Sequence, residues 1–505
     1  MDRQGSFVMT TTKLLVLVVG VGLWLTACKM GPDYARPETP TTEGWRLAPA
    51  TSESLANLPW WELLKDQELQ KLIRASLEEN LDLRIATANI NAYQAQLAIA
   101  KFDLAPQLHY TAGGFYYRNT NNAISIGDAA IIPGPTSDSD GLTLANERGN
   151  VGLKWEVDLW GRIRRSIEAT RAQLLSKVEN QRAVVLGLVS NVAQAYFDLR
   201  GLDLQIDITK RTLKTWEESV RLSALRYRHG DVSKLDLDRF EAERAGTAAQ
   251  LADLEREVVQ KENQISLLLG RRPMSISRGL TLVEQPMPPQ VPPGLPSDLL
   301  ERRPDIMQAE QDLTSATASI GVAQAQRFPS FALTGAVGGA SVQLNSLSLG
   351  PFATFSAGAN LAGPLLSASA LGYQVDVTEA QANAAMSQYK KTILTAFKEV
   401  EDALIAVQKA AEQRTALEQQ ITALKSSLSL ADLRYQGGRA TYLEVLTAQR
   451  SLFESEIALA RVRRNQLNSV VQLYKALGGG WQAADPASTA RNGSSNGQVA
   501  QKAAN

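Results

Sequence analysis

The sequence is short of the residues that most enzymes use for chemistry. Cys28 is its single cysteine, so no disulfide can form within the chain. Its two histidines, His109 and His229, stand in no HExxH pair, and no Walker lysine loop or GxSxG elbow occurs. The methionines form no metal-handling cluster either. These absences argue against an enzyme and predict no metal site.

An excess of charge and long apolar runs are also missing. The 52 basic and 52 acidic residues balance, so nothing indicates a nucleic-acid partner. Beyond the N-terminus, no stretch approaches the roughly 20 apolar residues that a helix needs to cross a bilayer. Any membrane crossing by this chain would have to use another kind of structure.

The N-terminus has the pattern of an export signal. Lys13 precedes the apolar run LLVLVVGVGLWL, and the small residues Thr26 and Ala27 follow it, which predicts a signal peptide over 1–27. Met9 is a second possible start. The motif Leu-Thr-Ala-Cys resembles the bacterial lipobox and implies a covalent lipid on Cys28, with no other cofactor; the alternative is an incidental cysteine. Lys29 in place of aspartate favours sorting to the outer membrane.

The distribution of proline predicts very long helices. No proline occurs between Pro135 and Pro273, or between Pro364 and Pro486, and proline is excluded from helix interiors. Within these stretches, apolar positions over 175–199 and 383–407 alternate steps of three and four, which is typical of coiled-coil packing. The proline-rich segment 271–296 is predicted to be a connector.

The chain also repeats itself. The phrase LRYRHG at Leu225–Gly230 returns as LRYQGG at Leu433–Gly438, an offset of 208 residues. Upstream the offset is 223, as for Asp82 and Asp305, so the first copy carries 223 − 208 = 15 extra residues. These fall near 123–141, which is predicted to be an exposed loop. The copies are assigned to 65–270 and 297–481, with helix-to-helix turns at 227–233 and 435–441.

Four segments alternate apolar and polar residues with the period of a β-strand, about 107–117, 150–158, 330–337 and 354–361. Their length suits tilted strands that cross a bilayer. The side chains predicted to face lipid are Leu108, Tyr110, Leu153, Trp155, Phe331, Leu333, Phe355 and Leu361. Open sheet edges are not tolerated in hydrocarbon and four strands cannot close a barrel, so several copies must share one.

Several motifs together resemble the TolC-type outer-membrane efflux proteins, in particular their lipid-anchored branch. The resemblance covers Cys28 to Trp481, and within this range 28–64 is predicted to be a lipid-anchored arm. The remaining 482–505 are a polar tail predicted to be disordered. The motifs are CKMGPDYARP at Cys28, PWW at Pro59, WEVDLWGRIRR at Trp155, LLERRPDI at Leu299, LGGGW at Leu477 and the two tyrosine-glycine turns.

The resemblance implies a mixed α+β membrane protein. Three copies would form a twelve-stranded barrel in the outer membrane of a Gram-negative bacterium, continuous with a periplasmic tunnel of long helices. The implied function is the exit duct of a tripartite efflux system for drugs or other small solutes. The implied partners are outer-membrane lipid, a periplasmic adaptor (membrane fusion) protein and an inner-membrane pump of the RND type.

The resemblance also assigns roles to the two turns. The expected adaptor contacts are Gly230, Asp231, Val232, Gly438, Arg439 and Ala440. The expected periplasmic gate comprises a latch between Tyr435 and Asp236 and an acidic ring at Glu444. Thr447 stands where the family has a second acidic residue, so the ring would have one layer.

Two alternatives stay open from the sequence. A type I protein-secretion duct uses the same architecture. A structural coiled-coil envelope lipoprotein would share the lipid, the heptads and the polar tail, but it has no use for four barrel strands or duplicated turns. Ion conductance separates the structural lipoprotein from either duct.

Overall fold

The computed structural model describes residues 29–38, 44–46, 61, 64–119, 142–286, 296–341 and 353–479. The predicted lipidation site Cys28, the loop 123–141 and the tail 482–505 lie outside the described residues. The chain divides into two compact units. One comprises Met1–Arg36, Ala92–Leu174 and Gln311–Met386, and the other comprises Pro37–Asn91, Leu175–Glu310 and Ser387–Asn505.

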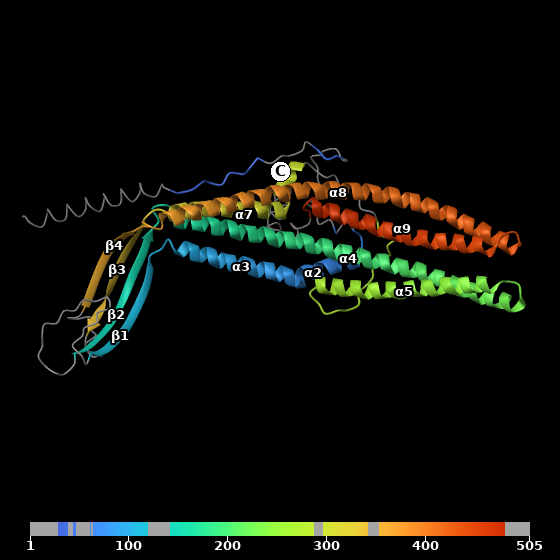
Figure 1. Cartoon of the computed structure of the whole chain (residues 1–505), viewed down its shortest axis with the longest axis horizontal. Coiled ribbons are helices and arrows are strands. Elements are labelled where there is room, and N and C mark those ends of the chain that lie inside the picture. The colour runs from blue at the N-terminus through green and yellow to red at the C-terminus, as the bar shows by residue number, and fades with distance from the viewer. Residues whose placement is uncertain are drawn as a thin grey trace, which may run out of the picture. The chain divides into compact units, whose positions relative to one another are not determined.

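The first unit contains one antiparallel sheet (Figure 1), with its strands in the order β1-β2-β3-β4. The strands are β1 (Gln107–Asn119), β2 (Leu142–Val157), β3 (Ser330–Ser341) and β4 (Ala353–Ala362). Strand β2 begins well before the predicted residue 150. The reason is its partner: β1 continues to Asn119, and its pairing with Leu142 extends β2 beyond the segment with clear alternation.

The register gathers the alternating apolar residues on one face. Leu108 pairs with Leu153, and Trp155 pairs with Leu333. Residues that pair across antiparallel strands share a face. This apolar face comprises Leu108, Tyr110, Val151, Leu153, Trp155, Val157, Phe331, Leu333, Val337, Phe355, Ala357, Ala359 and Leu361. The opposite face presents His109, Thr111, Asn150, Lys154, Glu156, Thr334, Ser356 and Asn360.

Large apolar side chains on this face remain uncovered in the chain. Tyr110 and Phe355 are each 83% exposed, and Leu108 and Leu361 are 73% and 66% exposed. The predicted lipid-facing residues on the two inner strands are half-buried by their neighbours on either side. A face of this size requires a partner, because soluble proteins seldom leave such contiguous apolar surface in water.

The long helices occur in pairs of matching length. They are α3 (Leu81–Phe102) and α7 (Pro304–Ala325), 22 residues each; α4 (Arg162–His229) and α8 (Ala368–Gln436), 68 and 69; and α5 (Lys234–Leu268) and α9 (Tyr442–Ala476), 35 each. The short helices are α2 (Gln67–Glu79), α6 (Leu299–Arg302) and the 3₁₀ turn Pro296–Asp298. None of the described helices is long and apolar enough to cross a membrane.

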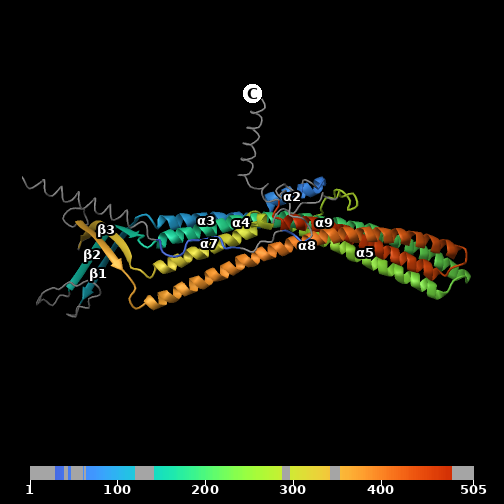
Figure 2. The same ribbon diagram turned by 90° about the horizontal axis from the view of Figure 1, so that it is seen from above.

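In the second unit, the last parts of α4 and α8 each fold back onto a following helix, α5 and α9, as Figures 1 and 2 show. Lys261 of α5 bonds Asp198 of α4 at 3.1 Å, and Arg463 of α9 bonds Glu418 of α8 at 3.0 Å. The proline-free stretches therefore form two helical hairpins.

The predicted heptad seam is buried over part of its length. In α4, Val189, Val192, Tyr196 and Leu199 are at most 1% exposed, whereas Leu175 at the start of the seam is 44% exposed. Within 383–407 of α8 the buried positions are Tyr389, Ile393, Ala396, Val400 and Ala403. Asn383 and Lys390, two polar residues within the predicted spacing, are exposed in the single chain. Tyr389 and the two alanines, which the seam omitted, fill the packed face instead.

Two helix junctions share the same construction. The Asn80 side chain donates to the carbonyl oxygen of Leu268 at 2.8 Å, and Arg303 Nη1 donates to that of Ala476 at 3.0 Å. Asn80 and Arg303 stand 223 residues apart, and the two carbonyls stand 208 apart, which are the offsets of the sequence repeat. Positions that correspond in the repeat therefore donate hydrogen bonds to corresponding carbonyl oxygens at the ends of α5 and α9, although the donating side chains differ.

Glycine is required where these junctions pack. Gly270 and Gly478 end α5 and α9 with φ of 68° and 74°, a conformation that costs other residues energy. A Cβ on Gly270 would lie 2.6 Å from the carbonyl oxygen of Glu79, and one on Gly478 would lie 3.0 Å from that of Arg302. The glycines thus allow each hairpin to return against the short helix before it.

A buried carboxylate fastens the start of α2. Asp66 is 0% exposed and caps α2 by accepting the backbone N–H groups of Glu68 and Leu69. Its Oδ2 also accepts hydrogen bonds from the Tyr196 hydroxyl at 2.8 Å and from Gln285 Nε2 at 2.6 Å, and from the Leu280 N–H at 3.1 Å. Burial raises the pKa of the Tyr196 phenol above its usual range, so it stays a donor. Asp66 therefore joins α2, α4 and the segment after α5.

Candidate gate at the ends of the helical hairpins

The two turns predicted from the repeated phrase have the same backbone geometry. Gly230 and Gly438 have φ of 80° and 70°. Each accommodates a pair of hydrogen bonds of the Schellman type: Gly230 N–H to the Tyr227 carbonyl at 3.1 Å and Gly438 N–H to that of Tyr435 at 3.0 Å, each followed by a bond five residues back. A Cβ on either glycine would meet no other atom within 4 Å. Conformation alone therefore explains these two glycines.

In each hairpin the second helix begins at an equivalent position of the repeat. The contacts of its third residue differ between the two hairpins. Ser233 caps α5 by accepting the Asp236 N–H, and its hydroxyl donates to the Asp236 carboxylate at 2.8 Å. Glu444, at the equivalent position in α9, instead lies 3.5 Å from Arg434 of α8. The predicted latch and ring carboxylates are thus counterparts in the two hairpins, and each has a partner within its own hairpin.

The other turn residues lie at the exposed end of the hairpins. Asp231 and Arg439 are exposed, and Val232 and Ala440 are half-buried. Thr447, one turn after Leu443, donates its hydroxyl to the Leu443 carbonyl at 2.8 Å and so uses its polar group within α9.

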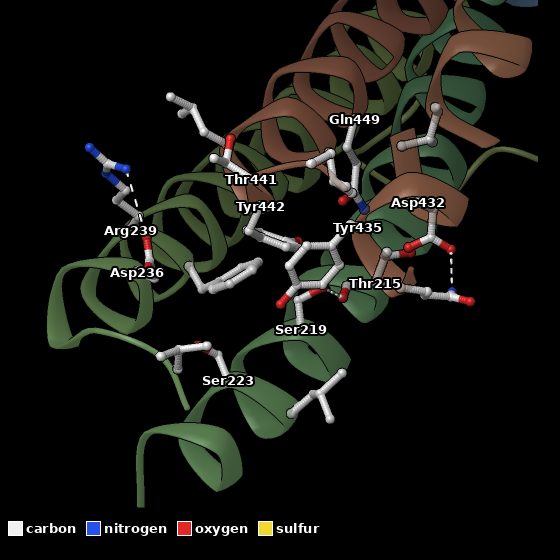
Figure 3. Close-up of a pocket in the computed structure, with 18 of the residues that line it drawn as sticks. Thr215, Ser219, Ser223, Asp236, Arg239, Asp432, Tyr435, Thr441, Tyr442 and Gln449 are labelled. Carbon is white, nitrogen blue, oxygen red and sulfur yellow. Dashed lines mark hydrogen bonds and ion pairs between the residues drawn. The ribbon is translucent and has the colours of Figure 1, made fainter. Parts of the chain in front are cut away.

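A groove of 1020 Å³ lies between the two hairpins at this end of the second unit (Figure 3). Its lining comes from all four helices and both turns, and includes Thr215, Ser219, Ser223, Asp236, Arg239, Asp432, Tyr435, Thr441, Tyr442 and Gln449. The predicted gate residues Tyr435 and Asp236 therefore line one groove.

Four aromatic rings connect the hairpins here, one from each helix. Trp216 of α4 lies 6.3 Å from Phe240 of α5, Phe240 lies 4.3 Å from Tyr442 of α9, and Tyr442 lies 4.9 Å from Tyr435 of α8, measured between ring centroids. Burial raises the pKa of the Tyr442 phenol above its usual range, so its hydroxyl stays neutral. Aromatic pairs at such distances are attractive beyond the area they bury.

Tyr435 is held by Arg226 rather than by Asp236. Arg226 of α4 donates through Nη1 to the Tyr435 hydroxyl and places its guanidinium 5.3 Å from the ring centroid. Asp236 bonds Ser233 and lies 3.8 Å from Arg239, and it makes no hydrogen bond to Tyr435 within the described chain. The expected Tyr435–Asp236 contact is therefore absent from this single chain, because each side chain already has a nearer partner.

Sequence reasoning missed Arg226 and the aromatic residues around Tyr435. Arg226 has a repeat counterpart in Arg434, so the offset of 208 could have drawn attention to the pair. Trp216, Phe240 and Tyr442 have counterparts Leu424, Ala448 and Lys234, and no repeat marks them. Their convergence results from the folding of both hairpins.

Paired long helices, two hairpin turns of the same geometry and a four-stranded sheet with an exposed apolar face are the features of an outer-membrane channel protein. The sequence matches the family described as outer membrane efflux protein over residues 72–271 and 295–479. The chain therefore belongs to the outer membrane efflux protein family, and it is an outer-membrane efflux channel protein.

Individual relatives span nearly the whole chain. The toluene efflux pump outer membrane protein TtgC of Pseudomonas putida is 35% identical, covering 93% of this chain and 96% of that protein. The cation efflux system protein CusC of Escherichia coli is 31% identical, covering 94% and 100%. The open-state outer membrane channel MtrE of Neisseria gonorrhoeae superposes with a TM-score of 0.78 at 31% identity, covering 90% and 99%.

Proposed function

We propose that three copies of this chain form one closed pore, which serves as the exit duct of a tripartite efflux system. The observation that carries the proposal is the sheet of the first unit. Its outer strands β1 and β4 each have one neighbouring strand in the described chain, and its apolar face is uncovered. In hydrocarbon every backbone polar group must be paired, so β4 of one copy would pair with β1 of the next.

Three copies give twelve strands, which lies within the range of known outer-membrane barrels. The apolar face would then contact lipid, and the face with His109, Lys154 and Glu156 would line a water-filled interior. The matching helix pairs and equivalent junctions support a duplicated unit, so each copy would contribute two hairpin ends to one periplasmic ring of six.

Transport through the duct would be driven by an inner-membrane pump, of the RND type in the lipid-anchored branch. A periplasmic adaptor would bridge that pump to the hairpin turns. The covalent lipid on Cys28 would anchor the chain to the outer membrane. Relatives named for toluene and for cations are 35% and 31% identical to this chain over nearly its whole length, so the cargo would be chosen by the pump.

We expect the Arg226–Tyr435 pair to hold the resting duct shut by joining the two hairpins of one chain. Arg226→Met and Tyr435→Phe each remove the hydrogen bond and keep most of the side-chain volume. Each should raise vancomycin uptake and resting conductance, and the double variant should exceed either single variant by little, because both remove the same bond.

Asp236→Ala tests the alternative latch. It removes the carboxylate that accepts the Ser233 hydroxyl but leaves the Ser233 cap of α5 and the Arg226–Tyr435 bond intact, so vancomycin uptake should stay near that of the unaltered protein. A leak from Asp236→Ala with none from Arg226→Met would assign the latch to Asp236, through a contact between subunits.

We further expect Glu444 and Arg434 to set the ion preference of the pore in opposite directions. Symmetry would place three copies of this pair around the axis. There the carboxylates would attract cations, and the guanidinium groups would weaken that attraction. In planar-bilayer recordings, Glu444→Gln should shift the cation-to-anion permeability ratio toward one, and Arg434→Gln should raise it. If neither substitution moves the ratio, this pair lies away from the constriction.

The function itself is tested by conductance of the purified protein in a planar bilayer. An exit duct gives stable single-channel currents, and a coiled-coil envelope tether gives none. Identifying the cross-linked inner-membrane partner in cells would separate a small-solute pump from type I protein secretion.

A further inference from the structure

The segment that follows Cys28 lies in a tightly built site of the first unit. The Met30 N–H donates to the Trp160 carbonyl at 3.2 Å. Arg165, in the first turn of α4, donates from Nε to the Met30 carbonyl and from Nη2 to the Gly31 carbonyl, each at 2.8 Å. The backbone of the segment is therefore held on both its donor and acceptor groups.

The guanidinium that holds it is buried and fully partnered. The Arg165 side chain is 1% exposed, and its Nη1 lies 3.0 Å from carboxylate oxygens of both Asp33 and Glu168. Lys29 also reaches Glu168, at 2.6 Å. The charge of Arg165 lowers the pKa of the Asp33 carboxyl, so this partner stays ionised. A buried charge is stable only with such partners, so loss of the segment would leave Arg165 short of acceptors.

Two glycines show that only backbone atoms fit where the segment meets α7. Gly31 has φ of +85°, and a Cβ on it would lie 2.4 Å from the Cα of Gly321 in α7. A Cβ on Gly321 would lie 2.5 Å from the Met30 carbonyl oxygen. Glycine at both positions lets the segment contact α7 directly, an approach that any side chain would prevent.

We propose that these residues (Lys29, Gly31, Arg165, Glu168 and Gly321), here called the anchor clasp, fix the attachment point of the lipid. The proposal rests on acylation of Cys28, which precedes Lys29 by one peptide bond. The clasp lies where β2 ends at Val157 and α4 begins at Arg162, so the acyl chains would enter the membrane beside the sheet rather than at the end of a free tether. The segments KMGPDY, which begins at Lys29, and WGRIRR, which begins at Trp160, meet in this clasp.

Trypsin cleavage after Lys29 tests the clasp on the purified, full-length protein in detergent. A protease acts on an extended segment, so cleavage requires the clasp to open. Gly31→Ala leaves the Arg165 side chain in place, but it strains the left-handed backbone and puts a methyl group against Gly321 of α7. It should release the acylated Cys28–Lys29 dipeptide at least about tenfold faster, as judged from the cost of a left-handed alanine alone. The dipeptide and the body beginning at Met30 are both followed by mass spectrometry.

Gly187→Ala is the matched control, because a Cβ there meets no atom within 4 Å, and its cleavage rate should equal that of the unaltered protein. Arg165→Met should also raise the rate of cleavage after Lys29. Single-channel conductance of this variant shows whether the rest of the protein remains folded. Equal rates for Gly31→Ala and the unaltered protein would overturn the clasp. A mass showing unacylated Cys28 would overturn its role in placing a lipid, and would leave the proposed duct untouched.

Discussion

Replacing Phe355 with arginine is expected to prevent insertion and assembly. Phe355 is 83% exposed on the apolar face, where it pairs with Val337. An arginine on the lipid side of a membrane strand costs about 2–4 kcal/mol near the midplane. One barrel would contain three such arginines, and their combined cost is comparable with the whole free energy of unfolding of many proteins. The measurement is the amount of oligomer in the outer-membrane fraction.

Ser356→Arg is the control for this experiment. Ser356 is the next residue of β4 and pairs with Ala336 on the polar face, so its side chain points to the opposite side of the sheet. The same charge there would face water in the pore, and assembly should proceed with altered ion preference. If Phe355→Arg assembles normally while Ser356→Arg does not, the two faces have been assigned the wrong way round.

Replacing Asp66 with alanine is expected to open the region where α2, α4 and the segment after α5 meet. The carboxylate accepts bonds from the Tyr196 hydroxyl, Gln285 and the Leu280 N–H, and all would lose a buried acceptor. Leaving one buried donor unsatisfied costs about 1–3 kcal/mol, so the opening free energy of this region should fall by at least about 3 kcal/mol. Hydrogen exchange of the α2 amides measures it.

Glu68→Ala is the appropriate comparison, since it removes a carboxylate from the same first turn of α2. Glu68 pairs with Lys71 at 2.7 Å in a partly exposed bridge, and such pairs contribute about 1 kcal/mol or less. Similar exchange rates in Asp66→Ala and Glu68→Ala would show that the buried network does not hold the region together.

The sheet and the turns could be predicted because their signals are local. Strand alternation depends on neighbouring residues, so Leu108, Trp155 and Phe355 could be placed on one apolar face before their strands were paired. The turns at Gly230 and Gly438 follow from a glycine after a helical stretch, since a left-handed backbone favours that residue. The repeat then located the second turn from the first.

The contacts that join the hairpins could not be predicted in the same way. The Arg226–Tyr435 bond links residues 209 positions apart, and no periodicity encodes which side chains of two hairpins meet. Similarly, the start of β2 depended on how far its partner strand continued. The family resemblance placed Tyr435 in the gate region, but the structure gives it a partner that the resemblance did not name.

The two hairpins match more closely in backbone than in side-chain contacts. Asp236 and Glu444 occupy the same helix position, yet the first bonds Ser233 of its cap and the second lies near Arg434. Three of the four aromatic residues at the groove, Trp216, Phe240 and Tyr442, have no aromatic counterpart in the other copy. The two hairpins can thus share one fold while contributing differently to the proposed gate.

The central claim is that the chain is incomplete alone and closes its barrel with identical copies. Native mass spectrometry of the detergent-solubilised protein tests this most directly, with circular dichroism as the check that the helices are intact. The account predicts a species of three chains with no folded single chain at equilibrium. A stable monomer with its helices intact would contradict the account, because the outer edges of β1 and β4 would then be tolerated without a pairing strand.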